Sequence, residues 1–136
     1  LDARVAPLDP DYVIIWGGIN DLYGGFPPEG IMENLKDLFV KTSEIGAEPI
    51  ACTLTSVADF DAAIPSIKRL NESIREHCSE NSIPFADLFA ATSDDEGRLE
   101  GRYSSDGVHL TDAGNERVAR AVYEDVIEVL IDGISA

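Results

Sequence analysis

Residues 12–21 read YVIIWGGIND, and the order of elements along the chain follows from this stretch. Its first half, Tyr12–Trp16, is a short continuous run of apolar and β-branched residues after a turn that contains proline. Such a run is typical of a strand buried on both faces. Two glycines then let the backbone turn sharply at the end of the strand. We therefore expect a buried strand that delivers residues 19–21 to the edge of a sheet.

Beyond this run, short apolar stretches alternate with longer stretches of helical spacing. The predicted elements are a strand at Tyr12–Trp16, a helix at Glu29–Ile45, a strand at Pro49–Leu54, a helix from Pro65, a strand at Ile83–Leu88 and a helix at Thr111–Ile131. This order predicts an α/β fold, with a parallel sheet covered by helices on both faces. Sites in such sheets lie at the carboxyl ends of the strands, here the loops after Trp16, Leu54 and Leu88.

The loop after the first strand carries the first candidate for chemistry. The side-chain amide of Asn20 would project over the carboxyl edge of the sheet, where an N–H group can donate to a developing oxyanion. A purely structural interpretation competes with this one. Asn20 and Asp21 also suit an Asx-turn or the cap of a following helix.

The second candidate, Asp106-Gly107-Val108-His109, lies just before the last helix. Residues three apart across a turn lie within about 7 Å, so Asp106 can accept a hydrogen bond from one imidazole nitrogen of His109. That bond fixes the tautomer and leaves the other nitrogen as a base. The alternative is a solvated loop histidine beside a helix cap.

Taken together, the two stretches resemble the SGNH (GDSL-type) hydrolase family over essentially the whole chain. Gly18-Ile19-Asn20-Asp21 looks like the family's third block, and residues 103–111, with Gly114 following, look like its fifth. The resemblance implies that Asn20 is the oxyanion donor, His109 the general base and Asp106 its orienting partner. It also implies that Gly18 and Asp21 shape the loop that carries Asn20. Gly18, Ile19, Asp21 and Thr55 are the candidate substrate-binding residues.

The chain departs from the family in one large respect. The Gly-Asp-Ser block that supplies the nucleophile occurs nowhere in the sequence, and nothing ahead of Leu8 could supply the second block. We expect both in sequence upstream of Leu1, so that the 136-residue chain alone is close to inactive. Residues 1–136 would then be a single domain, the C-terminal part of a flavodoxin-like sheet with its last three strands.

The absence of the first two strands would leave Tyr12–Trp16 as an exposed edge. A flat apolar edge is a template for pairing or aggregation. We therefore expect this edge to be occupied, either by the missing N-terminal segment or by a second copy of the chain.

Charge and cysteine content limit the other partners. With 26 acidic and 10 basic residues the net charge is −16, which disfavours nucleic acid. The longest apolar run is too short to span a membrane. Cys52 and Cys78 have no metal spacing, so free buried thiols are expected, and they favour a reducing compartment such as the cytoplasm. His77 is expected at the surface and Asp94–Gly97 in a solvated turn, so no metal or cofactor is expected.

Three functions remain open on these residues. The first is an ester hydrolase (esterase, lipase or acylhydrolase) acting on a small acyl ester such as a lysophospholipid, a thioester or an acetylated sugar. The second is a non-catalytic member of the same fold that binds a carbohydrate or an acyl group. The third is an unrelated flavodoxin-like signalling or binding domain, in which Asn20 and His109 would point to different edges.

Overall fold

Three parallel strands form the sheet in the computed structural model, which describes residues 1–135. The strands are β1 (Tyr12–Ile15), β2 (Glu48–Cys52) and β3 (Phe85–Ala86), in the order β1-β2-β3. Both pairs are parallel, with Tyr12 opposite Glu48 and Cys52 opposite Ala86. The predicted α/β fold is confirmed: each crossover passes through a helix, and the carboxyl ends of all three strands meet at one edge.

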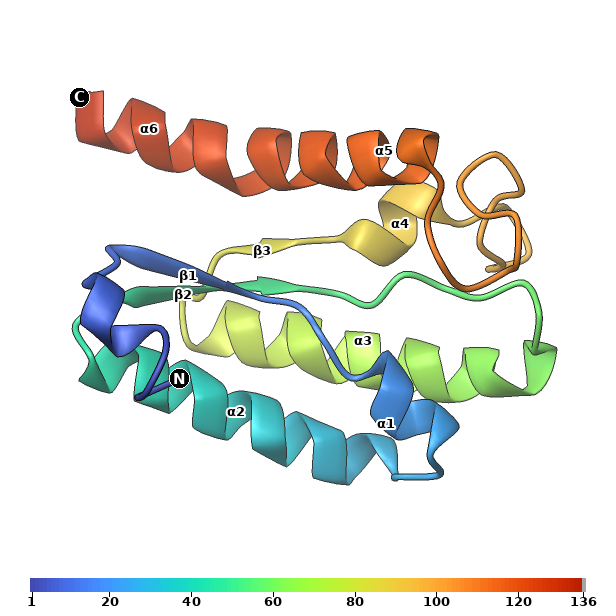
Figure 1. Cartoon of the computed structure of the whole chain (residues 1–136), viewed down its shortest axis with the longest axis horizontal. Coiled ribbons are helices and arrows are strands. Elements are labelled where there is room, and N and C mark those ends of the chain that lie inside the picture. Colours follow the sequence, from blue (N-terminus) through green and yellow to red (C-terminus); the bar gives the residue numbers. More distant parts are fainter. Residues whose placement is uncertain (136) are drawn as a thin grey trace.

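Helices cover both faces of the sheet (Figure 1). α2 and α3 lie side by side on one face, and α5 and α6 follow one another in line over the other. None of the described helices is both long and apolar enough to cross a lipid bilayer. The helices are α1 (Ile19–Tyr23), α2 (Pro28–Glu44), α3 (Ile64–Glu80), α4 (Leu88–Thr92), α5 (Asp112–Val122) and α6 (Glu128–Ser135), with short turns η1 (Ala6–Leu8), η2 (Asp61–Ala63) and the π-helical η3 (Tyr123–Ile127).

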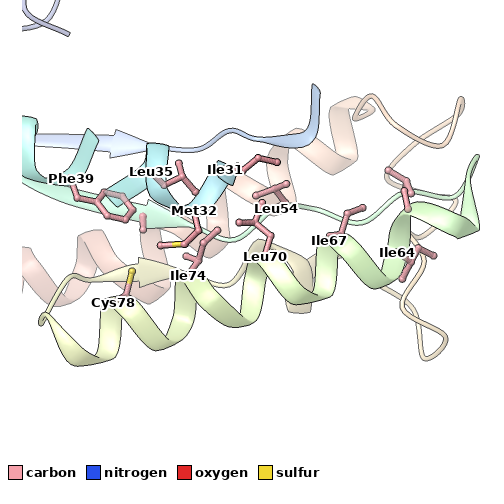
Figure 2. Packing of buried hydrophobic residues seen from close by; sticks show 13 residues of the cluster. Ile31, Met32, Leu35, Phe39, Leu54, Ile64, Ile67, Leu70, Ile74 and Cys78 are labelled. Atoms are coloured by element: carbon pink, nitrogen blue, oxygen red, sulfur yellow. The ribbon is translucent and has the colours of Figure 1, made fainter. Parts of the chain in front are cut away.

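The larger core lies between the sheet and helices α2 and α3 (Figure 2). The apolar positions predicted from helical spacing on α3 are the buried ones: Ile67 and Leu70 are fully buried, and Ile74 and Cys78 are nearly so. The residues that meet them include Ile31, Met32, Leu35 and Phe39 of α2. A second, smaller cluster fills the other face of the sheet and consists of Ile50, Cys52, Ala86, Leu88, Val118, Ala121 and Val126.

The burial predicted for the first strand is wrong on one face. Ile14 is 50% exposed and Trp16 is 46% exposed. The reason is that β1 pairs only with β2, so it is the edge strand, and the buried cluster on this face is built on residues of β2 and β3. The edge position that the family resemblance implied is thus confirmed.

The third strand is shorter than its apolar pattern predicted. Instead of continuing to Leu88, it stops at Ala86 because Asp87 caps a helix that the sequence did not predict. The Asp87 carboxylate accepts a hydrogen bond from the backbone N–H of Ala90 at 3.2 Å and a bidentate ion pair from Arg75. Helix α4 therefore turns the chain away from the sheet directly after β3.

The structure also shows the environment of the two cysteines, of His77 and of the turn at Asp94–Gly97. Cys52 and Cys78 are free and buried, and burial raises the pKa of both thiols to about 11. His77 is partly exposed, and its ring stacks on Phe39 with centroids 5.7 Å apart. Asp94 closes a turn by accepting from two backbone N–H groups. Within residues 1–135, no cluster of acidic, His or Cys side chains is arranged to hold a metal ion.

Burial in the α3 core predicts a large stability difference between two identical substitutions. Ile67→Ala removes a fully buried side chain and should lower the free energy of unfolding by about 2–5 kcal/mol. Ile134→Ala, at a position 74% exposed, should change it by less than about 0.5 kcal/mol. Urea unfolding followed by circular dichroism measures both values. Equal losses would show that α3 does not pack as described.

Candidate active site

The turn between β1 and α1 requires glycine at position 18. Gly18 has φ +121°, and a Cβ atom there would lie 3.1 Å from the Ile31 side chain. Gly18 is also the N-cap of α1, without any side-chain cap. Asn20, an exposed residue in the first turn of α1, therefore does not cap the helix. Among the described residues no hydrogen bond is found for its side-chain amide, which leaves the N–H groups available to a ligand.

In the loop before α5, the carboxylate of Asp106 contacts the imidazole of His109. Asp106 Oδ2 lies 2.7 Å from His109 Nδ1, while Asp106 Oδ1 accepts from the backbone N–H groups of Val108 and His109, at 2.8 Å each. The Val108 N–H and then the His109 ring hold the pKa of the Asp106 carboxyl well below its usual range. An ionised carboxylate can only accept, so Nδ1 carries a proton, and in the neutral imidazole Nε2 then has the free lone pair. The imidazole is otherwise open to solvent, with its side chain 86% exposed.

Ser104 braces the same loop from beneath. Its buried hydroxyl donates to the carbonyl of His109 at 2.6 Å and accepts from the backbone N–H of Gly107 at 2.9 Å. Both contacts hold the loop backbone, and the Ser104 oxygen also lies 3.3 Å from Asp106 Oδ1, on the carboxylate that contacts His109. Ser104 is therefore a structural residue of the loop, a role that its position in the sequence did not reveal.

A cavity of about 560 Å³ lies at the carboxyl edge of the sheet and brings the two candidate stretches together. Six of the seven predicted site residues line this cavity. The seventh, Asp106, contacts the ring of His109 but is not part of the wall. Trp16 and Asn115 also line the cavity and were not predicted, because an edge tryptophan and a polar residue in the first turns of a helix look ordinary in sequence. The lining residues are Trp16, Gly17, Gly18, Ile19, Asn20, Asp21, Leu54, Thr55, Val108, His109, Leu110 and Asn115.

A buried polar residue of α3 fixes the part of the wall that follows β2. Asn71 is fully buried; its side chain accepts from the Leu54 N–H at 2.7 Å and donates to the Leu54 carbonyl at 3.0 Å. These bonds replace the sheet partners that Leu54 lacks beyond the end of β2. The sequence placed Asn71 on a helix but gave no sign of this contact, which holds Leu54 and Thr55 at the cavity.

The cavity wall contains no serine side chain in the described part of the chain. Its one hydroxyl is that of Thr55. Ser56 is buried and donates to the carbonyl of Gly97 at 2.5 Å, and Ser105 is exposed but lies outside the wall. The described part of the site thus has an imidazole held by a carboxylate, and a side-chain amide for which no hydrogen bond is found, but no serine between them.

A family model described as GDSL-like Lipase/Acylhydrolase matches residues 1–117. The chain belongs to this family. The predicted family is therefore confirmed, and the positions on which the resemblance rested, Asn20 and His109, both fall within the matched region of this GDSL-like chain.

Solved structures with similar folds include a GDSL-like lipase from Bacteroides thetaiotaomicron, with a TM-score of 0.84 and 23% identity over 92% of this chain and 66% of that one. Another is an acetyl xylan esterase from Geobacillus stearothermophilus, with a TM-score of 0.76 and 21% identity over 91% of this chain and 63% of that one. The shared architecture confirms the fold of the GDSL-like chain and shows that it spans about two thirds of these structures.

Among curated proteins, an N-acylneuraminate cytidylyltransferase from Streptococcus agalactiae serotype V is 32% identical over 103 residues. The match covers 73% of the GDSL-like chain but only 24% of the relative, and a second S. agalactiae cytidylyltransferase matches with 31% identity over the same shares. The chain therefore spans about a quarter of the length of these curated relatives.

The His109 loop should be sensitive to a side chain at position 107. Gly107 has φ +88°, and a Cβ atom there would lie 2.7 Å from the backbone nitrogen of Asp59. Gly107→Ala should therefore lower the free energy of unfolding by about 1–3 kcal/mol. Gly101→Ala is the matched control, because Gly101 has no positive φ and no neighbour within 4 Å of a Cβ. Urea titrations of both variants test this, and equal stabilities would contradict the tight loop contact.

Proposed function

We propose that this chain carries the base, the orienting carboxylate and the oxyanion donor of an ester hydrolase that works by serine-type acyl transfer. The observation that supports this most is the convergence of Asn20 and the His109–Asp106 pair on one cavity. Family membership supports the reaction class. In this proposal residues 1–136 are one domain's C-terminal part, and the serine comes from polypeptide outside this sequence.

The chemistry assigns one task to each group. The serine Oγ attacks the ester carbonyl while His109 Nε2 accepts the hydroxyl proton. The Asn20 side-chain N–H donates to the oxygen that becomes negative, and ionised Asp106 stabilises the imidazolium. His109 then gives the proton to the departing alcohol, and water releases the acid from the acyl-enzyme. No metal or cofactor takes part in these steps.

The walls of the cavity suit a small acyl ester. Gly18, Ile19, Asp21 and Thr55 line the same cavity as Asn20 and would contact the acyl or alcohol portion. An acetyl ester of a sugar is the first substrate to assay, because one similar structure is an acetyl xylan esterase and the curated relatives are named for an acylated sugar acid.

A comparison of the 136-residue chain with the natural protein in full length tests the source of the nucleophile. Loss of a triad nucleophile lowers turnover by about 10⁶, so the isolated chain should show no burst with p-nitrophenyl acetate. The natural protein should release close to one equivalent of p-nitrophenol per site. A stoichiometric burst from the isolated chain would contradict the proposal, and Thr55 would become the hydroxyl to test.

Variants of the natural protein serve as controls for the assigned roles. Asn20→Ala should lower kcat by about 10²–10³, the usual effect of losing one oxyanion donor. Asn81→Ala and His77→Ala, at the other end of α3, should leave kcat unchanged. A natural protein that binds acyl sugars without hydrolysing them would favour the non-catalytic alternative.

We further propose that the β1 edge is covered, by polypeptide outside this sequence in the natural protein and by a second copy in the isolated chain. Half-exposed Ile14 and Trp16 support this, because exposed apolar edges promote pairing. The isolated chain should then sediment as a dimer or larger species at micromolar concentration, and Ile14→Lys should shift it to monomer. A stable monomer of the unmodified chain would contradict the proposal.

A further inference from the structure

The helix that carries Asn20 is tied to a second loop through Tyr23. Tyr23 follows Asn20 by three residues, so both side chains lie on the same side of α1. The Tyr23 hydroxyl donates to Asp59 Oδ1 at 2.8 Å, and its ring lies 6.3 Å from that of Phe60, centroid to centroid. Helix α1 is therefore bound to the segment between β2 and α3.

That segment, residues 56–61, also contacts the loop of His109. The backbone N–H of Ala58 donates to the carbonyl of Gly107 at 2.8 Å. The backbone of Asp59 lies so close to Gly107 that only a glycine fits there. One short segment thus contacts the helix of Asn20 through a side chain and the loop of His109 through its backbone.

The 56–61 segment also makes hydrogen bonds to residues 97–99. The Ser56 hydroxyl donates to the Gly97 carbonyl, and the N–H of Leu99 donates to the Val57 carbonyl at 3.3 Å. Arg98 makes two hydrogen bonds to the Asp61 carboxylate, at 3.0 and 2.6 Å. Because the segment is held at both ends, it can fix the position of helix α1 relative to the loop of His109.

We propose that Tyr23 and Asp59 are positioning residues, which set the separation between the Asn20 amide and the His109 imidazole. The inference rests on the proposed function, in which those two groups act on one reacting centre. Neither residue lines the cavity, so each acts through another residue and makes no contact with substrate. A misplacement of about 1 Å in such a site can cost as much as 10²-fold in rate.

The hydrogen bond between Tyr23 and Asp59 does not depend on pH under assay conditions. Burial and the neighbouring Asp59 carboxylate raise the pKa of Tyr23 to about 12. The hydroxyl thus keeps its proton, and remains a donor, throughout the pH range in which an esterase would be assayed. Tyr23 is also 39% exposed, so removal of one hydroxyl oxygen should leave the fold intact.

The first test is Tyr23→Phe in the natural protein at full length, assayed with p-nitrophenyl acetate. We expect kcat to fall about tenfold with KM changed less than twofold, because Asn20 is misplaced while the cavity wall remains. Asp59→Ala should have the same effect, and Asp59→Asn, which keeps an acceptor oxygen, should restore part of the loss. Tyr123→Phe, on an exposed tyrosine of η3, is the matched control and should leave kcat unchanged.

The decisive measurement is the coupling between Tyr23 and Asn20. If Tyr23 acts through Asn20, then Tyr23→Phe should lower kcat in the unmodified protein but not in the Asn20→Ala background. An equal loss in both backgrounds, or no loss in either, would overturn the inference. If Asn20→Ala alone were fully active, the proposed function itself would fail, so the two failures are distinguishable.

Discussion

The hydrogen bond of 2.7 Å between Asp106 Oδ2 and His109 Nδ1 is the interaction on which the site depends. It requires an ionised carboxylate, and the backbone N–H groups of Val108 and His109 keep the carboxylate in that state and in place. It also requires a loop that bends back within three residues, which Gly107 allows through its positive φ. With Nδ1 protonated, Nε2 of the neutral imidazole keeps a lone pair at the cavity, and the proposed reaction uses it as the base.

The parallel sheet explains why Asn20 lies near this histidine although the two are far apart in sequence. Carboxyl ends of parallel strands meet at one edge, so the turn after β1 and the segment after β2 converge with the loop that precedes α5. Because Gly18 has no Cβ, the turn before α1 can lie close to Ile31, and Asn71 fixes the backbone of Leu54. Residues 56–61 then connect the two sides of the cavity.

The main elements could be predicted because they depend on local patterns, and half of the residues of the cavity wall were among the predicted site residues. The apolar runs of β1 and β2 and the spacing of Ile67, Leu70 and Ile74 on α3 identify strands and helices without any knowledge of their partners. The exposure of Ile14 depends instead on what covers a face of the sheet, which periodicity cannot reveal. For the same reason the contacts of Asn71 and the Tyr23–Asp59 bond were not predicted, since each joins segments that only the fold brings together.

In the proposed reaction, Asn20 and His109 act on the same reacting centre. A crystal structure of the natural protein after reaction with diethyl 4-nitrophenyl phosphate, which phosphorylates reactive serines, tests this most directly. We expect a serine adduct in the cavity, with a phosphoryl oxygen about 3 Å from the Asn20 side-chain nitrogen and the ester oxygen beside His109 Nε2. An adduct elsewhere, or one that reaches His109 while the Asn20 amide points away from the phosphoryl oxygen, would contradict it.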